Sequence, residues 1–377
     1  MNTKLNHKER LFSIADKIKP VDKEKFYKIA ENRLNKLIKP KGSLGRLEDF
    51  AKDVVAITEE ERPFSACYNK ENKRLNLNKY VCVFAGDHGV VEEGVSLFKQ
   101  DVTTQMVVNF LSGGAAINTI AASVGADVLV IDVGIKNDAP FQGDNFISGK
   151  VKNGTFNIYK GPAMTENEAV ESILKGIETA DIVIKKKGAK ICATGDMGIG
   201  NTTPASAITC YYSKKSPELV CGKGTGVSAA VIKKKAAIIK KAVEFNIKDG
   251  VKGDAVDVLA GVGGLEIGAI AGFIIGCALN RTPVVVDGFI STAGALIALN
   301  INPAVLDYMF MGHLSEEKGH KTAVAIIGKT PILNLSMRLG EGTGAVIAMK
   351  IIETALNMYN NMLTFDEAGV IASKLNV

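Results

Sequence analysis

The 377-residue chain contains no tryptophan, and aromatic residues make up only 6% of it. Proteins that bind single-stranded nucleic acid usually combine basic residues with aromatic side chains on which bases stack. No such basic stripe occurs here, and the formal charge of +6 is small for the length. The composition therefore predicts no nucleic-acid partner, and surface lysines account for the excess charge.

Cysteine is also sparse, and no two of the six cysteines form a Cys-x-x-Cys pair. Cys82 and Cys192 stand inside apolar runs that are typical of buried strands. This favours small core side chains in a reducing compartment over a disulfide framework or a zinc site. Residues 1–30 form a charged helical pattern without an apolar centre. The sequence thus predicts no signal peptide and a cytoplasmic location.

Long apolar runs are rare, but residues 258–279 form one that is long enough to suggest a membrane span. The run contains Glu266 and six glycines, and another apolar strand follows it directly. A glycine-rich helix buried between other layers explains this composition better than a lipid environment does. We therefore predict no membrane-spanning segment.

From residue 79 onward, short apolar runs alternate with longer helical patterns. The predicted strands are 80–85, 128–132, 190–194 and 283–287, and a further apolar run covers 308–311. The predicted helices of this part are 102–124, 165–187, 203–212, 228–245, 258–279 and 344–362. Apolar strands separated by helices indicate a parallel α/β sheet covered on both faces. Charged helices are expected within residues 1–60, and residues 69–78 are predicted to be a linker.

Three predicted strands end in acidic or glycine-rich turns, at residues 85–89, 194–203 and 287–292. In open parallel sheets, ligands bind beyond the carboxyl ends of the strands, so these turns are expected to line one crevice. The second turn is the strongest phosphate candidate, because its glycines allow close approach and Asn201 and Thr202 then begin a helix. It lacks the spacing of a Walker loop or a dinucleotide fingerprint. An ordinary capped turn is the alternative.

Two other segments carry residues of chemical interest. Phosphoribosyltransferases that use ribose pyrophosphate have two adjacent acids at a strand end, whereas here Asp287 is followed by Gly288. His313 and His320 flank acidic residues, but the HExxH spacing of a helical zinc site is missing. Ser315, followed by acidic residues, instead predicts a helix N-terminus. The sequence thus favours neither a magnesium-pyrophosphate site nor a zinc site.

Glu341 lies between two glycines in the segment 338–345, which has apolar residues on both sides. A surface turn would explain the glycines but not the apolar flanks. A carboxylate near a buried cleft is a candidate base, because desolvation raises its pKa toward neutrality. The segment by itself leaves both interpretations open.

Taken together, these motifs resemble the nicotinate-nucleotide:dimethylbenzimidazole phosphoribosyltransferase family of the cobalamin pathway. The resemblance covers nearly the whole chain, and the motifs occur in the same order. They are residues 39–45, 86–90, 93–95, 113–116, 131–134, 161–164, 200–203, 287–289, 317–319 and 338–345.

The resemblance implies a homodimer with a Rossmann-like parallel sheet that carries helices on both faces, plus a small helical domain. The expected division is an N-terminal helical segment (1–78), a catalytic domain (79–345) and a C-terminal helix (346–377) that joins the small domain. The implied reaction moves 5-phosphoribose from nicotinate mononucleotide to a benzimidazole-type base, without a cofactor or a metal.

The resemblance also implies roles for individual residues, with Glu341 as the catalytic base. The expected substrate-binding residues are Phe98, Met106, Asp196, Met197, Gly198, Asn201, Thr202, Lys235, Asp287, Leu339 and Gly340. Relatives often have glutamate where this chain has Asp196, and Phe98 and Met106 indicate an apolar wall for the base. The identity of the base therefore stays open.

Three alternatives remain at this stage. One is a transferase that uses activated ribose pyrophosphate and requires magnesium. The second is a non-catalytic nucleotide-binding protein. The third is a member of the same fold with another acceptor, such as a purine or a phenol.

Overall fold

The structure is a computed structural model that describes residues 6–137, 141–222, 224, 226, 228–247 and 254–371. Its main sheet has six parallel strands in the order β5-β4-β3-β6-β7-β8. These are β3 (Lys79–Gly86), β4 (Ala126–Gly134), β5 (Phe146–Ser148), β6 (Ile191–Met197), β7 (Val284–Val286) and β8 (Met309–Met311). The predicted parallel α/β fold is confirmed. Only β5 was missed, because this short edge strand is only half-buried.

Counted along the chain, the six strands have the spatial order 3-2-1-4-5-6, which is that of doubly wound nucleotide-binding folds. The order reverses between β3 and β6, which pair directly. Ligands of such sheets bind at this reversal, beyond the carboxyl ends of the strands. The segments after Gly86 and Met197 therefore lie where the topology favours a binding site.

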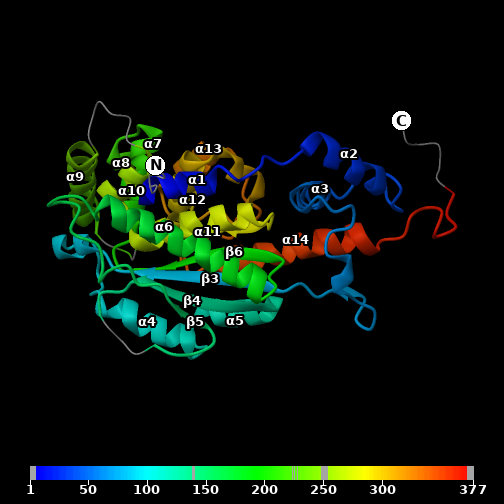
Figure 1. Ribbon diagram of the computed structural model, residues 1–377, viewed down its shortest axis with the longest axis horizontal. Helices are drawn as coiled ribbons and strands as arrows, with labels where there is room; N and C mark the ends of the chain where they lie inside the picture. Colours follow the sequence, from blue (N-terminus) through cyan, green and yellow to red (C-terminus); the bar gives the residue numbers. More distant parts are fainter. Residues whose placement is uncertain are drawn as a thin grey trace, which may run out of the picture.

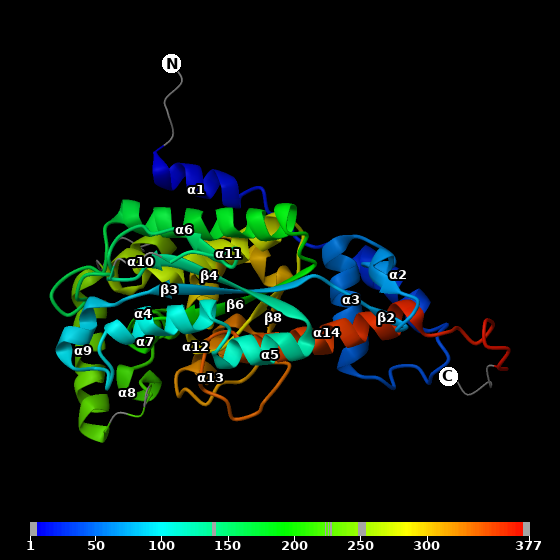
Figure 2. The same cartoon turned by 90° about the horizontal axis from the view of Figure 1, so that it is seen from below.

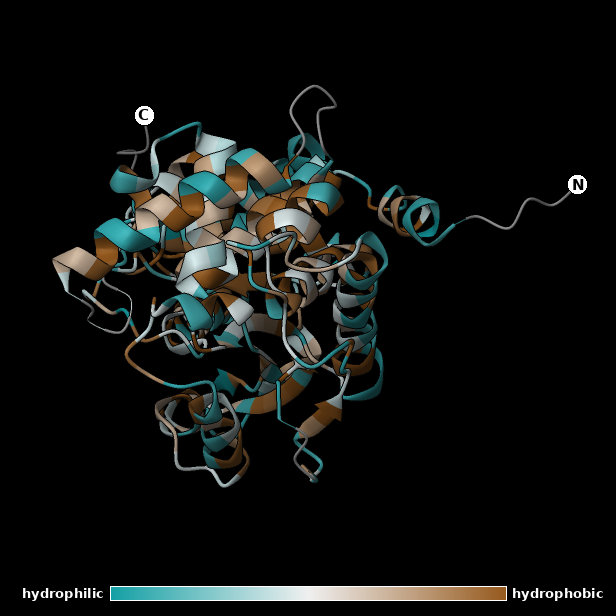
Figure 3. Ribbon diagram, turned by 90° about the vertical axis from the view of Figure 1, so that its left-hand side faces the viewer, coloured by the Kyte–Doolittle hydropathy of each residue, from teal (hydrophilic) through white to brown (hydrophobic). Residues whose placement is uncertain are grey.

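Helices cover both faces of the sheet (Figure 1). On one face, α11 (Leu265–Leu279) packs on β3, where the rings of Phe84 and Phe273 lie 5.5 Å apart. Side chains alternate along a strand, so Val81 points to the opposite face. There it meets the start of α14 (Thr343–Asn361), and α5 (Ala116–Val124) lies beside α14 (Figure 2). Apolar residues line the strands between these layers (Figure 3).

The other helices surround this core. They are α1 (His7–Ala15), α2 (Lys23–Leu34), α3 (Arg46–Thr58), α4 (Asp101–Leu111), α6 (Glu166–Asp181), α7 (Thr202–Ser213), α8 (Pro217–Val220), α9 (Ala229–Asn246), α10 (Ala255–Val262), α12 (Phe289–Ile301) and α13 (His320–Ile327). A π-helix, Ile182–Lys186, extends α6, so the two together cover the helix predicted over 165–187.

Three predicted elements differ from the structure. The helix expected over 102–124 is two helices, because residues 112–115 form a turn in which Gly113 has φ +79°. The run 258–279 likewise breaks at Gly263 and Gly264 into α10 and α11. The expected linker at 69–78 contributes to the hairpin β1 (Tyr68–Asn69) and β2 (Arg74–Leu75). In the two helical runs hydrophobic periodicity continued across a local break in the backbone, whereas the polar composition of 69–78 concealed a short hairpin.

One stretch of the described chain, Asp101–Val124, is long and apolar enough to cross a membrane by length and composition. The turn between α4 and α5 divides it into two helices, each too short to span a bilayer. Such a turn would also leave main-chain groups without partners in lipid.

The glycines of α11 allow this helix to pack closely against α6. A Cβ at Gly272 would lie 1.8 Å from the carbonyl oxygen of Ile173, so only glycine fits there. Residues 265–278 of α11 are all buried. The expectation that this apolar run is a buried helix rather than a membrane span is confirmed.

We expect Gly272→Val to destabilise the fold by at least ~3 kcal/mol, because a side chain there forces the two helices apart. Gly161→Ala is the control: no atom lies within 4 Å of its Cβ position, so a change below ~0.5 kcal/mol is expected. Urea unfolding of both variants measures the difference. Equal stabilities would show that the α6–α11 contact is not close.

The helices α2 and α3 lie at one end of the molecule together with the C-terminal part of α14 (Figure 1). The first residues of α14 contact β6 and β7, so this single helix connects the sheet to the terminal helices. The expected domain boundary after residue 345 falls in its first turn. The helix α1 packs on α6 instead. The division into domains stays a prediction.

Candidate active site

A pocket of about 630 Å³ opens beyond the carboxyl ends of β6, β7 and β8. The predicted site residues on its wall are Phe98, Asp196, Asn201, Thr202, Leu339 and Gly340. They come from three separate parts of the chain, so the fold brings together much of what the sequence marked. We call this cavity the nucleotide pocket.

One end of the nucleotide pocket is the first turn of α7. Its N-cap residue, Asn201, donates its side-chain amide to Asp196 Oδ2 at 3.0 Å instead of capping the helix. The Thr203 N–H already donates to the Gly200 carbonyl at 3.0 Å and Pro204 has no N–H, but the helix dipole still favours an anion at this end. Thr202 lines the pocket at this point. The predicted phosphate-binding turn is therefore followed by an uncapped helix start.

Lys235 reaches the same end of the pocket from α9. Its Nζ donates to Thr202 Oγ1 at 2.6 Å, although only 1% of the residue is exposed. Burial lowers its pKa below the ordinary 10.5, because the charged form is desolvated. Among the described residues, no carboxylate forms an ion pair with it. A buried cation beside an uncapped helix start suits a phosphate.

Asp196 lies on the pocket wall next to the first turn of α7. It is 6% exposed, and its Oδ1 has no hydrogen-bond partner within the described chain. Burial raises its pKa well above 3.8, and the carboxylates of Asp287 and Glu266 raise it further. The side chain is thus a hydrogen-bonding group that still has an oxygen free for a ligand.

This raised pKa leads to a stability prediction. Above pH 3.8 the unfolded chain loses a proton that folded Asp196 keeps, so stability falls as pH rises toward the raised pKa. Asp196→Asn removes this loss, and we expect it to stabilise the protein by ~1–2 kcal/mol at pH 7 but not at pH 3.5. Thermal unfolding at the two pH values tests this. A variant that is less stable at pH 7 would contradict it.

Glu341 lies in a tight loop against the end of β6. Glu341 has a φ of +63°, and its two neighbours, Gly340 and Gly342, have φ values of +87° and +93°. Left-handed backbone is unfavourable for a residue with a side chain of this kind, and strained residues are enriched at functional sites. The loop can approach the strand because Gly195 has no side chain: a Cβ there would lie 2.5 Å from the carbonyl oxygen of Glu341.

The carboxylate of Glu341 is 6% exposed and lies behind the pocket wall that Gly340 forms. Its Oε2 accepts a hydrogen bond of 3.2 Å from the main-chain N–H of Ile117, in the first turn of α5. Burial raises its pKa above 4.5, and the nearby Asp287 adds to this, whereas the bond from Ile117 opposes it. A carboxylate with a raised pKa, fixed through one oxygen, suits a general base.

Asp287 does not line the pocket and is fully buried beneath it. Its two oxygens accept main-chain hydrogen bonds from Gly342 and Ala345, at 3.2 and 2.8 Å. Met106 and Met197 are partly buried against the core. Gly198 packs against β3, since a Cβ there would lie 2.2 Å from the Gly86 oxygen. These four predicted ligand residues therefore lie around the pocket rather than on its wall.

The individual site residues predicted from the sequence make up only part of the wall, although the turn 287–292 was expected to line it as well. The additional lining residues are Gly224, Gly226, Gly288, Phe289, Ile290, Ser315, Glu317, Ser336, Met337 and Arg338. Most of them directly follow β7 or β8, or precede Leu339. The rule that ligands lie beyond strand ends could have identified them.

The turn after β3 does not line the nucleotide pocket but connects neighbouring elements beside it. His88 Nε2 and Glu266 Oε1 lie 2.8 Å apart, and both residues are buried. This contact joins the end of β3 to the first turn of α11. Asp87 accepts bonds from the Thr103 hydroxyl and the Lys136 main chain. The expected single crevice is therefore formed by the second and third turns.

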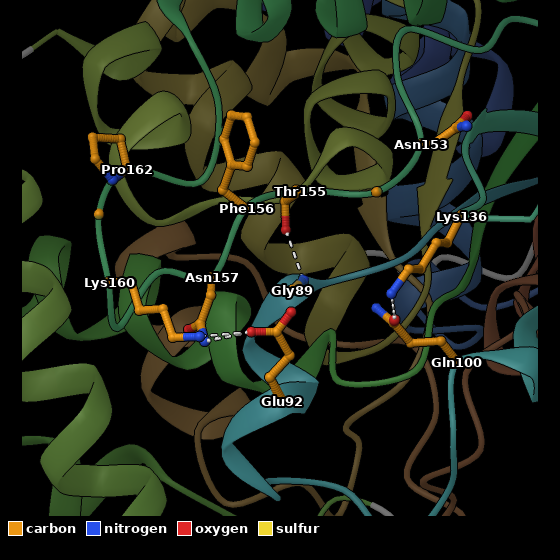
Figure 4. A pocket seen from close by; sticks show the side chains of 12 residues that line it. Gly89, Glu92, Gln100, Lys136, Asn153, Thr155, Phe156, Asn157, Lys160 and Pro162 are labelled. Atoms are coloured by element: carbon orange, nitrogen blue, oxygen red, sulfur yellow. Dashed lines mark hydrogen bonds and ion pairs between the residues drawn. The ribbon is translucent and has the colours of Figure 1, made fainter.

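A second cleft of about 530 Å³ lies over the other half of the sheet, beside Gly89 (Figure 4). Its polar side chains are largely paired with one another. Lys136 donates to Gln100 at 3.0 Å, and Lys160 contacts Glu92 at 2.9 Å. The cleft therefore presents fewer unpaired groups to a ligand than the nucleotide pocket does.

The two histidines considered as metal ligands are both buried. His320 Nδ1 accepts from the main-chain N–H of Ser315 at 2.8 Å, and its Nε2 contacts Thr292 Oγ1 at 2.9 Å. Burial lowers its pKa to about 3. The predicted helix start at Ser315 is wrong: α13 begins at His320, because residues 314–316 pair with a neighbouring loop. Within the described ranges, no cluster of three His, Cys, Asp or Glu side chains could hold a metal ion.

Comparisons with known proteins agree with this geometry. A family model described as Phosphoribosyltransferase matches residues 18–370. The nicotinate-nucleotide–dimethylbenzimidazole phosphoribosyltransferase of Geobacter metallireducens is 51% identical over 355 residues, covering 94% of this chain and 96% of the relative. The crystal structure of CobT from Thermus thermophilus superposes with a TM-score of 0.85 at 41% identity, covering 93% of this chain and all of that one. The chain therefore belongs to the nicotinate-nucleotide–dimethylbenzimidazole phosphoribosyltransferase family.

Proposed function

We propose that this enzyme transfers 5-phosphoribose from nicotinate mononucleotide to 5,6-dimethylbenzimidazole or a similar base. The products are α-ribazole 5′-phosphate and nicotinate, with inversion at C1′, as a step in assembling the cobalamin nucleotide loop. The observation that carries the proposal is the nucleotide pocket, which combines an uncapped helix start and Lys235 at one end with the Glu341 loop at the other.

The chemistry needs only one proton acceptor. In nicotinate mononucleotide the pyridine nitrogen is already cationic, so nicotinate leaves C1′ without a general acid. The incoming imidazole attacks C1′ through one nitrogen and must lose a proton from the other. A single positioned carboxylate, that of Glu341, can take this proton. Two-carboxylate mechanisms such as those of glycosidases are therefore not required.

The pocket gives each part of the nucleotide a place. The 5′-phosphate is proposed to bind the first turn of α7, with Thr202 and Lys235 as donors. Asp196 and Gly340 then flank the ribose on the way to Glu341. Fixing the phosphate and the acceptor base in one cavity aligns C1′ with the attacking nitrogen. Met197, Gly198 and Asn201 are proposed to hold this turn in place.

The acceptor base is proposed to be apolar and planar. Phe98 and Leu339 give the pocket an apolar section, and Met106 lies on the neighbouring α4. Asp196 reaches one methylene less far than the glutamate that relatives often have. A base slightly larger than the usual one, or a bridging water, would fill the difference.

We also propose a homodimer in the cytoplasm. Phe98 and Leu339 line the pocket yet are 49% and 57% exposed, and Leu97 and Leu335 are similarly exposed. Apolar side chains exposed at a pocket mouth are typical of a surface that another chain covers. Light scattering of the purified protein tests the dimer.

The reaction is tested by incubating the enzyme with nicotinate mononucleotide and a panel of benzimidazoles, purines and phenols. Nicotinate release, followed by chromatography, should depend on a base and should persist in EDTA. No release with any base would reject the proposal. Activity with ribose pyrophosphate that EDTA abolishes would support the magnesium-dependent alternative.

A further inference from the structure

The loop that carries Glu341 lacks a cap of its own. The N-cap residue of α14 is Gly342, which has no side chain to accept the first N–H groups of the helix. Unpaired N–H groups at a buried helix start are costly unless another part of the chain accepts them. Thr343, the first residue of α14, is 1% exposed, so water reaches this site poorly.

Asp287 supplies the missing cap from the end of β7. Its Oδ2 accepts from the main-chain N–H of Gly342 at 3.2 Å, and its Oδ1 accepts from that of Ala345 at 2.8 Å. The negative charge also lies at the positive end of the α14 dipole. Both oxygens are therefore engaged on the residues directly after Glu341.

The surroundings fix Asp287 in this position. Its main-chain N–H donates to Thr194 Oγ1 on β6 at 3.2 Å. His313 Nε2 lies 3.6 Å from its Oδ1, and the His313 ring packs against Gly344. Thr194 on β6 thus fixes the main chain of Asp287, and His313 after β8 lies against its fully buried carboxylate.

We propose that Asp287 is a positioning residue for the reaction: it contacts no substrate and instead holds the Glu341 loop in its left-handed conformation. This inference rests on the proposed role of Glu341 as the base. Glu341 is then held at two points. The main chain directly after it is fixed by Asp287, and its carboxylate is fixed by the N–H of Ile117. The base keeps its place before any substrate arrives.

The test is Asp287→Asn, which keeps the shape but must place an NH₂ group against one of the two main-chain N–H donors. We expect kcat to fall ~30-fold or more, because a displaced base loses its alignment with the acceptor. The KM and the calorimetric Kd for nicotinate mononucleotide should change less than ~3-fold. A large rise in Kd with little change in kcat would mean that Asp287 binds the substrate, and would overturn the proposal.

Asp132→Asn is a matched control. Asp132 is also a buried carboxylate at a strand end, and its Oδ1 accepts main-chain bonds from Gly134 and Ile135. It lies near the carboxyl end of β4, outside the nucleotide pocket. This variant should lose stability to a similar degree but keep kcat. Equal losses of kcat in both variants would reduce Asp287 to a general structural role and overturn the proposal.

The pH profile is a further readout. Both Asp287 and Asp196 lie near Glu341, and the charge of Asp287 raises the Glu341 pKa. Removing that charge should therefore move the acidic limb of the kcat/KM profile to lower pH. If the acidic limb did not move, Asp287 would not act on Glu341, and the proposal would be overturned. His313 is the other titratable side chain that faces Asp287 among the described residues.

Two outcomes separate this proposal from the role of Glu341. If Glu341→Gln turns over like wild type, the role of Glu341 is wrong and the positioning role falls with it. If Glu341→Gln is inactive but Asp287→Asn keeps its kcat, only the positioning role is wrong. Should Asp287→Asn not fold, hydrogen exchange in the wild type decides. The Gly342 and Ala345 amides should then be as protected as the interior of α14, and fast exchange would overturn the proposal.

Discussion

Glu341→Gln should lower kcat by about 10²–10⁴-fold, the usual contribution of a general base. The amide can still accept the hydrogen bond from the Ile117 N–H, so the loop should stay in place. Binding of nicotinate mononucleotide should change little, because its proposed phosphate donors are Thr202 and Lys235, whereas the Glu341 carboxylate lies behind the wall at Gly340. Single-turnover measurement of nicotinate release separates the chemical step from product release.

The pH dependence gives this prediction a second measurement. The pKa of Glu341 is raised above 4.5, mainly by burial, so its base form disappears as pH falls through that raised value. The wild-type kcat/KM profile should therefore have an acidic limb above pH 4.5, and the residual activity of the variant should lack it.

Glu92→Gln is the matched control, since Glu92 is an exposed glutamate in the second cleft. It should retain wild-type kcat. A Glu341→Gln enzyme with full activity, or an inactive Glu92→Gln enzyme, would move the catalytic site away from the nucleotide pocket.

Lys235→Met should reduce kcat/KM by about 10²–10³-fold, because truncating a buried charge that pairs with a ligand costs ~2–5 kcal/mol. Most of the loss should appear in KM, since the phosphate is bound equally in the ground and transition states. The change is measured with nicotinate mononucleotide over a wide concentration range.

The same substitution should stabilise the protein without substrate. Burial lowers the pKa of Lys235, whose hydrogen-bond partner within the described part of the chain is the Thr202 hydroxyl, so its folded form holds a proton less tightly than the unfolded chain does. Stability therefore rises with pH from the lowered pKa up to 10.5. Lys235→Met removes the penalty and should flatten this slope. Methionine fits because it matches the long aliphatic stem.

Lys234→Met is the control for Lys235, because Lys234 is its exposed neighbour on α9. Its kcat/KM and its stability should stay close to those of the wild type. If Lys234→Met raised KM as much as Lys235→Met, the phosphate would be attracted by the general charge of α9 rather than by one buried ammonium.

Local sequence patterns were sufficient to predict much of the candidate site. The apolar strand β6, the glycines after it and the helix that begins at Thr202 are all properties of one continuous stretch. The burial of Lys235 also follows from its spacing, since it shares a helical stripe with Ile238, Ile239 and Ala242. Such features depend on neighbours in sequence, so periodicity and turn composition indicate them.

Three helix predictions failed, two because a glycine pair inside the run was overlooked and one because a distant segment decided the structure. Hydrophobic periodicity ran through 102–124 and 258–279, but glycine pairs break each run into two helices. The helix predicted at Ser315 does not start there, because residues 314–316 bond to a segment about twenty residues later. Pairing between distant segments outweighed a favourable local cap.

The sequence by itself determined the fold class, the glycine-rich turn before α7 and the loop that carries Glu341. Tertiary structure alone decided how that glutamate is held. Its carboxylate bonds to a helix start 224 residues earlier, and its loop is capped by a carboxylate from another strand, 58 residues before Ala345. Neither contact leaves a pattern in the sequence, because each joins groups that only the closed sheet and its packed helices bring within hydrogen-bond distance.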